Sequence, residues 1–181
     1  TTRLFVSTMQ GPIFSVSYDG KTVTEYVNIN APQWNMPVQT NFSERGVQSI
    51  AFHPQFNQRG TRGYGKFYTY SDTTNMAATA DFTHPATGHT HDTVLLEWTA
   101  QTPAAATYDG GAPREVILAA QPFVNHNSGE IAVHDLASTN APEFGLLVGC
   151  LADGGNGARP HTAPPNMQAA SRKRIPIHPP R

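Results

Sequence analysis

Short runs of β-branched and aromatic residues recur along the N-terminal part of the chain, and apolar positions in them alternate with polar ones. A period of two is typical of β-strands, whereas an amphipathic helix repeats every 3.6 residues. The runs cover residues 4–6, 13–18 and 22–27, and Gly-Pro and Asp-Gly-Lys turns separate them at residues 11–12 and 19–21. We therefore expect a three-stranded meander in this part of the chain.

Two further series of strand-like runs follow, and no convincing amphipathic helix interrupts them. The second series covers residues 47–52, 66–70 and 94–98, and the third covers residues 115–118, 130–133 and 144–151. About ten short strands without helices predict an all-β protein.

The spacing of the three series suggests an architecture. They begin near residues 3, 47 and 115, and a four-stranded propeller blade takes about 40 to 50 residues. This spacing predicts a β-propeller, although a β-sandwich also agrees with the periodicity. Residues 73–92 interrupt the second series, and we expect them to form a long polar loop, which in a compact domain is either functional or mobile.

Composition excludes some classes of partner. Of the 181 residues 14% are charged, and the formal net charge is -1, so no field gathers nucleic acid or an anionic membrane. No apolar stretch approaches the roughly 18 residues of a membrane span. No signal-peptide pattern precedes Thr1, and the chain opens almost inside a strand, as expected where processing or truncation has removed an earlier segment.

The single cysteine, Cys150, lies in the apolar run at residues 144–151. One cysteine cannot form an internal disulfide or a multi-cysteine zinc site. Because its neighbours are apolar, we expect Cys150 to be a buried small hydrophobic residue and not a reactive thiol.

Five segments, in this order, resemble the PQQ-dependent sugar dehydrogenases, also called the glucose/sorbosone dehydrogenase family. They are SERGVQSIAFHPQF at 43–56, GKFYTYSD at 65–72, HDTVLLEWTA at 91–100, QPFVNHNSGEIAV at 121–133 and LADGGNG at 151–157. The resemblance runs from about Arg3 to about Asn156. It implies a six-bladed β-propeller with PQQ over its axis and calcium beside it, which oxidises an aldose at the anomeric carbon and passes electrons to an external acceptor. It also implies a periplasmic or secreted location.

The resemblance assigns roles to four residues. His126 corresponds to the general base, which removes the hydroxyl proton while hydride passes to the quinone. Asp153 resembles the acid that orients this histidine. Glu44 and Asn125 fall at positions near the cofactor and the substrate. From the residues alone, His126 is more often a polar loop residue and Asp153 in Asp-Gly-Gly a turn residue, and Glu44 could equally be a solvated charge.

Other histidines have simpler interpretations. His84, His89, His91 and Asp92 crowd one predicted loop, and their spacing could bind zinc or copper. A cluster in one loop is weak support for a metal site, and we assign no metal ligands. We expect His53, before a proline at a strand end, to stabilise a turn.

The chain divides into residues 1–156, which resemble propeller blades, and residues 157–181, a diverged Pro- and Arg-rich tail. Six blades need roughly 240 to 300 residues, so this length reaches about three or four. The main calcium and quinone ligands of the family fall outside the chain, and a partial propeller has open sheet edges. Three interpretations remain: a fragment of a sugar dehydrogenase, a non-catalytic carbohydrate- or protein-binding module, or a shortened chain that assembles as a homo-oligomer.

Overall fold

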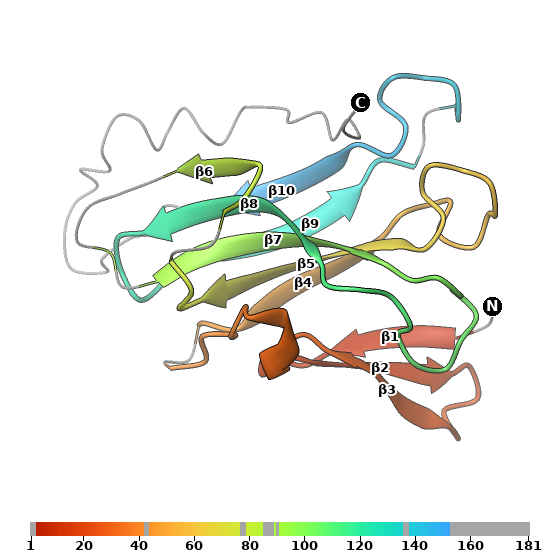
Figure 1. Ribbon diagram of the computed structural model, residues 1–181, viewed down its shortest axis with the longest axis horizontal. Helices are drawn as coiled ribbons and strands as arrows, with labels where there is room; N and C mark the ends of the chain where they lie inside the picture. Colours follow the sequence, from red (N-terminus) through yellow and green to blue (C-terminus); the bar gives the residue numbers. More distant parts are fainter. Residues whose placement is uncertain are drawn as a thin grey trace.

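A computed structural model describes residues 3–41, 44–76, 79–84, 89, 91–135 and 138–152 (Figure 1). Within these ranges the chain forms strands and one short 3-10 helix, which confirms the all-β class. The elements are β1 (Arg3–Ser7), β2 (Pro12–Ser17), β3 (Val23–Asn28), η1 (Pro32–Trp34), β4 (Val47–Phe52), β5 (Lys66–Thr73), β6 (Phe82–His84), β7 (His91–Thr99), β8 (Arg114–Gln121), β9 (Ser128–Val133) and β10 (Leu147–Leu151). None of the helical residues described forms a segment long and apolar enough to cross a membrane.

The first sheet is the expected meander, β1-β2-β3, with antiparallel pairing throughout. Its second turn depends on Asp19, whose carboxylate accepts hydrogen bonds from the Ser17 hydroxyl and the Lys21 amide. Gly20 follows with a φ of 72°, in the left-handed region that glycine adopts without steric cost. The outward face of this sheet is apolar, and Leu4, Val6 and Val23 are exposed on it.

The second sheet has five strands in the order β4-β5-β7-β8-β6. The first four form an antiparallel meander, and β6 adds in parallel to β8. Two sequence expectations are corrected here. Residues 114–121 belong to this second sheet and not to a third series, and residues 73–92 are not one long loop. β5 extends to Thr73, β7 begins at His91, and β6 lies between them.

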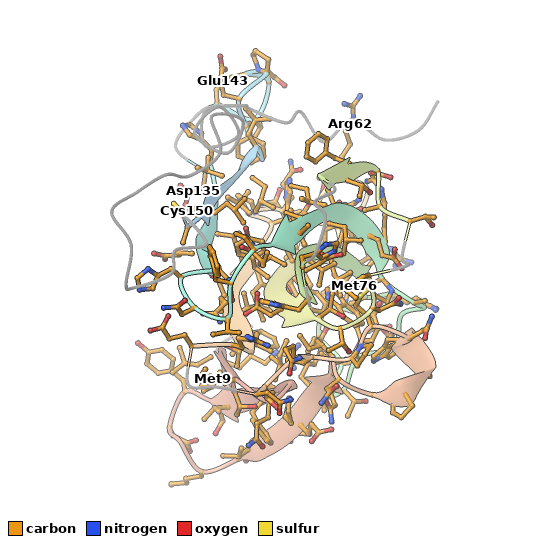
Figure 2. All side chains as sticks on the ribbon, turned by 90° about the vertical axis from the view of Figure 1, so that its left-hand side faces the viewer. Met9, Arg62, Met76, Asp135, Glu143 and Cys150 are labelled. Atoms are coloured by element: carbon orange, nitrogen blue, oxygen red, sulfur yellow. The ribbon has the colours of Figure 1, made fainter. Side chains whose placement is uncertain are left out.

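A third sheet consists of β9 and β10, whose ladder shifts register between Gly149 and Leu151. This hairpin packs against β4 and β5, so the five-stranded sheet lies between the other two sheets (Figure 2). None of the sheets in the described ranges closes on itself.

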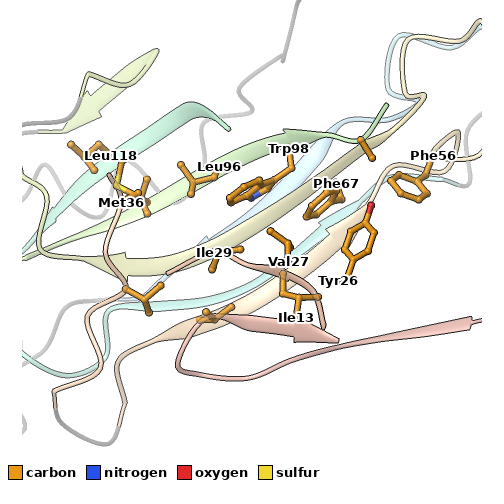
Figure 3. Packing of buried hydrophobic residues seen from close by; sticks show 14 residues of the cluster. Ile13, Tyr26, Val27, Ile29, Met36, Phe56, Phe67, Leu96, Trp98 and Leu118 are labelled. Atoms are coloured by element: carbon orange, nitrogen blue, oxygen red, sulfur yellow. The ribbon is translucent and has the colours of Figure 1, made fainter. Parts of the chain in front are cut away.

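The main core lies between the first and second sheets (Figure 3). Phe67 on β5 and Trp98 on β7 are fully buried and stack with ring centroids 5.9 Å apart. Their strands pair at this position, Phe67 opposite Trp98, which places the two rings side by side on one face. The Trp98 indole Nε1 donates to the Thr69 hydroxyl at 2.9 Å, so its one polar atom is satisfied within the core.

The expectation that Cys150 is buried is wrong, because its side chain is exposed. Leu147 and Leu151 turn inward and pack against the second core, which includes Tyr70 and Ile131. Side chains alternate along a strand, so the position before Leu151 faces outward (Figure 2). The apolar run at residues 144–151 is therefore buried on only one face of β10, and Cys150 lies on the exposed face.

Candidate functional site

The loop at residues 122–127, between β8 and β9, lies against the segment that precedes β4. The His126 amide donates a hydrogen bond to the Glu44 carboxylate at 2.9 Å, and Arg45 Nε donates to the Val124 carbonyl at 3.0 Å. The fold thus brings together Glu44 and His126, two predicted site residues, and Asn125 lies in the same loop. Both segments lead into the first strand of a sheet, which places them at one end of the strands.

His126 has a φ of 54°, in the left-handed region, which is uncommon for a residue other than glycine. Its side chain is exposed, while its amide is held by Glu44. Backbone in a sparsely populated conformation persists where surrounding contacts hold it. The imidazole is therefore presented to solvent from a backbone that is tied down.

Side chains, and not a strand ladder, hold the carbonyls of this loop. Asn127 Nδ2 donates to the Phe123 carbonyl at 2.7 Å and to the Asn125 carbonyl at 3.1 Å. Gln121 Nε2 donates to the carbonyl of Asn127 at 3.2 Å. Together with the Arg45 bond to Val124, these contacts satisfy four carbonyls in a row of five residues, so buried polar side chains set the shape of the loop.

Asn127 and Gln121 connect the loop to the five-stranded sheet. Asn127 is only 2% exposed, and its Oδ1 lies 2.9 Å from Nε2 of the buried His91. Because Asn127 Nδ2 is the donor to the loop carbonyls, Oδ1 accepts and His91 Nε2 carries the hydrogen. Burial lowers the pKa of His91, which favours this neutral form. Gln121 Nε2 also donates to the Thr93 hydroxyl at 2.8 Å.

The chain of hydrogen bonds ends at Asp72, whose side chain is fully buried. Its Oδ1 accepts from the Thr93 hydroxyl at 2.9 Å, and its Oδ2 accepts longer bonds, at 3.4 Å, from the Gly46 amide and Gln48 Nε2. Burial raises the pKa of Asp72 to about 6, although these bonds and the nearby Arg45 oppose the shift. A buried carboxyl that titrates near neutral pH thus lies beneath the segment that carries Glu44.

The predicted acid Asp153 lies outside the described residues. The description ends at Ala152, whose amide donates to the Asn127 carbonyl at 3.3 Å. The chain therefore reaches the candidate site directly before the position of Asp153.

The histidine-rich segment does not converge on one point in the part of the chain that the structure describes. His89 Nε2 pairs with the buried Asp92 Oδ1 at 2.9 Å, whereas His91 bonds to Asn127. Asp92 and His91 are adjacent in β7 and point to opposite faces. No group of three or more His, Cys, Asp or Glu side chains that could hold a metal occurs among the described residues, and the His84 side chain is not among them.

His53 has the structural role expected for it. Its Nδ1 accepts a hydrogen bond from the Gln55 amide at 3.0 Å, which stabilises the turn after β4. Burial lowers the pKa of His53, with a contribution from nearby Lys66.

The sequence interpretation missed the residues that support the loop: Arg45, Asp72, His91, Gln121 and Asn127. Two signals were present. Asp72 is an acid at the end of an aromatic strand, and Gln121 and Asn127 bracket the motif that contains His126. Their hydrogen-bond partners are distant in sequence, however, so these contacts could not be predicted from the sequence. In the comparisons with known proteins, no family model matches this chain and no curated protein matches it.

Proposed function

We propose that this chain is part of a quinone-dependent sugar dehydrogenase and that the loop before β9 carries the base for aldose oxidation. One observation carries the proposal: the hydrogen bond between His126 and Glu44 joins two residues 82 positions apart. The sequence had assigned both residues to the same site. An accidental resemblance would not be expected to select two residues that meet in the fold.

The arrangement of the sheets supports the propeller part of the proposal. β1, β4 and β9 are each the first strand of a sheet, and β4 packs against both of the others. In a propeller, successive blades place their first strands next to one another around the axis. We propose that the three sheets are consecutive blades, the second with β6 as an added outer strand.

Within this proposal the residues at the loop have separate roles. The exposed imidazole of His126 takes the proton of the anomeric hydroxyl as the general base. Glu44 accepts the hydrogen bond of the His126 amide and so fixes the backbone position from which the imidazole extends. The Asn125 side chain offers an amide for a sugar hydroxyl, and Asp153 is proposed to orient the base.

The described residues do not form a suitable binding site for PQQ and calcium. They contain no group of three or more His, Cys, Asp or Glu side chains that could hold a metal ion. Arg45, the basic residue beside the loop, is 3% exposed and donates inward to the Val124 carbonyl, so it is not directed to grip a quinone carboxylate. The residues described are therefore proposed only to hold the sugar and to accept its proton. A periplasmic or secreted location and an external electron acceptor are part of the same proposal.

The test is dye-linked oxidation of aldoses by the natural full-length polypeptide supplied with PQQ and calcium. We expect His126→Ala to lower kcat by about 100-fold or more, as loss of a general base does. His134→Ala is the matched control, since His134 is also an exposed loop histidine, and it should keep full activity.

A fully active His126→Ala variant would sink the base assignment. No oxidation of any aldose by the natural polypeptide, with PQQ and calcium present, would overturn the enzymatic proposal and favour a non-catalytic binding module or an assembling chain. The intact mass of the natural polypeptide separates a fragment from a shortened protein.

A further inference from the structure

A cavity of about 290 Å³ lies at the opposite end of the strands from the His126 loop. β1 contributes Arg3 and Phe5 to its lining, and the end of β4 and the turn after it contribute Phe52, His53 and Phe56. Its size is that of a small-molecule site and not of a water pocket. None of the residues proposed for sugar oxidation lines it.

Aromatic rings form much of the cavity wall. Phe5 and Phe52 lie with ring centroids 4.3 Å apart, and Phe52 meets Phe56 edge-on at 4.9 Å. Phe5 and Phe52 are both partly exposed, unlike Phe67 beneath them. These partly exposed rings offer an apolar ligand aromatic surface to pack against.

Arg3 supplies a positive charge without a negative partner. Its guanidinium donates to neutral groups only: the Ser15 hydroxyl at 3.1 Å and the carbonyls of Ala105 at 2.8 Å and Pro103 at 2.5 Å. Its Cζ lies 4.7 Å above the Phe5 ring. Among the described residues no carboxylate pairs with Arg3, and its buried Nε has no acceptor.

A cation that is partly removed from water and lacks a counter-ion is costly, and an anion beside it offsets that cost. Burial lowers the pKa of Arg3, in agreement with this missing compensation. The guanidinium nevertheless stays charged at neutral pH. The positive charge of Arg3 attracts an anion in the cavity even without direct contact. A hydrogen bond from the buried Arg3 Nε to that anion requires the side chains that cover Nε to shift.

We propose that this cavity binds a small aromatic monocarboxylate, with its ring against Phe5, Phe52 and Phe56 and its carboxylate beside Arg3. The ring burial and the charge pairing are both needed, because neither the partly open cavity nor one guanidinium alone holds a small ligand tightly. For a ligand of this size we expect binding in the millimolar range. The site is independent of the proposed sugar oxidation.

The test is an NMR titration of the wild-type chain with benzoate, with benzyl alcohol and acetate as matched probes. Benzoate should shift the ring signals of Phe5, Phe52 and Phe56 and the Arg3 Nε–H signal, and it should bind at least about fivefold more tightly than benzyl alcohol. Acetate should not saturate the site. Equal binding of benzoate and benzyl alcohol, or no shift at these residues with benzoate, would overturn the proposal.

Arg3→Gln is not sufficient as a test, because Arg3 also ties β1 to the loop at residues 103–105. Asn57→Asp is a more conservative variant, since Asn57 is exposed at the cavity lining and the substitution keeps the shape of the side chain while it adds a negative charge. It should weaken benzoate severalfold and leave benzyl alcohol unchanged. Asn140→Asp, an exposed substitution elsewhere, should alter neither, and an equal loss in both Asp variants would count against the site.

Discussion

The two ends of the five-stranded sheet are stabilised by different kinds of contact. At the end near Phe52, Phe67 and Trp98, stacked rings bury apolar surface against the first sheet. At the other end, Asp72 and Asn127 belong to a buried chain of hydrogen bonds that reaches the His126 loop. Apolar burial is non-directional, whereas hydrogen bonds fix orientation but add little net stability. The aromatic end therefore stabilises the fold, and the polar end positions a loop.

The largest expected effect is at the aromatic end. Trp98→Ala removes a fully buried side chain together with its bond to Thr69, and it leaves a large cavity between two sheets. We expect the free energy of unfolding to fall by about 3 to 5 kcal/mol, measured by urea denaturation. Tyr18→Ala is the control, because Tyr18 is 77% exposed and its loss should cost less than about 0.5 kcal/mol. Similar costs for both variants would contradict the assignment of the core.

The next effect is a pH dependence at the polar end. Asp72 has a pKa of about 6 in the folded chain, raised from its ordinary value of 3.8. A carboxyl with a raised folded pKa binds its proton more tightly when folded. Its contribution to stability is therefore fully present below about pH 4 and is lost as the pH rises through about 6.

Asp72→Asn cannot titrate and should lack this component. Between about pH 4 and pH 7, the free energy of unfolding of the wild type should fall relative to that of Asp72→Asn by up to about 3 kcal/mol. Denaturation curves across this range measure the difference, and the exposed Asp135→Asn provides a reference. A difference between wild type and Asp72→Asn that does not change with pH would show that Asp72 is not desolvated.

A smaller effect is expected where the polar chain meets the loop. Asn127→Ala removes the hydrogen bonds of Asn127 to the Phe123 and Asn125 carbonyls and to His91 Nε2, at a cost of about 1 to 3 kcal/mol. Because the loss is local, the amide of His126 should exchange with solvent about tenfold faster or more. Hydrogen exchange of single amides measures this, with the exposed Asn140→Ala as control. If Asn127→Ala lowers the global stability but the His126 amide does not exchange faster, Asn127 does not position the loop.

Much of the fold was predictable from local pattern. Every predicted strand is present, because alternation and turn residues such as Asp19 and Gly20 act within a few positions. β6 was missed, since a three-residue strand has too little pattern and depends on its pairing with β8. Cys150 was assigned to the interior because its neighbours are apolar, but the face of a strand that is buried depends on what packs against it.

The candidate site was predictable in part. Glu44, Asn125 and His126 were selected through the family resemblance, and the fold brings Glu44 to the His126 amide. Arg45, Asp72 and His91 were not selected, because their contribution arises from partners in other strands. His91 illustrates the reason: beside His89 and Asp92 in sequence it suggested a metal-binding loop, whereas its strand directs it to Asn127.

The sequence by itself determined the all-β class and the positions of the strands other than β6, because short-range periodicity and turn chemistry act along the chain. The site residues Glu44, Asn125 and His126 came from the family resemblance and remain predictions. Only the tertiary structure decided which strands share a sheet and which loops meet. Those contacts join residues far apart in the chain, such as His126 with Glu44 and Arg3 with the loop at 103–105, and they form only when the sheets pack. The buried chain from Asp72 to Asn127 has the same origin, since a polar group in the interior requires partners that neighbouring strands provide.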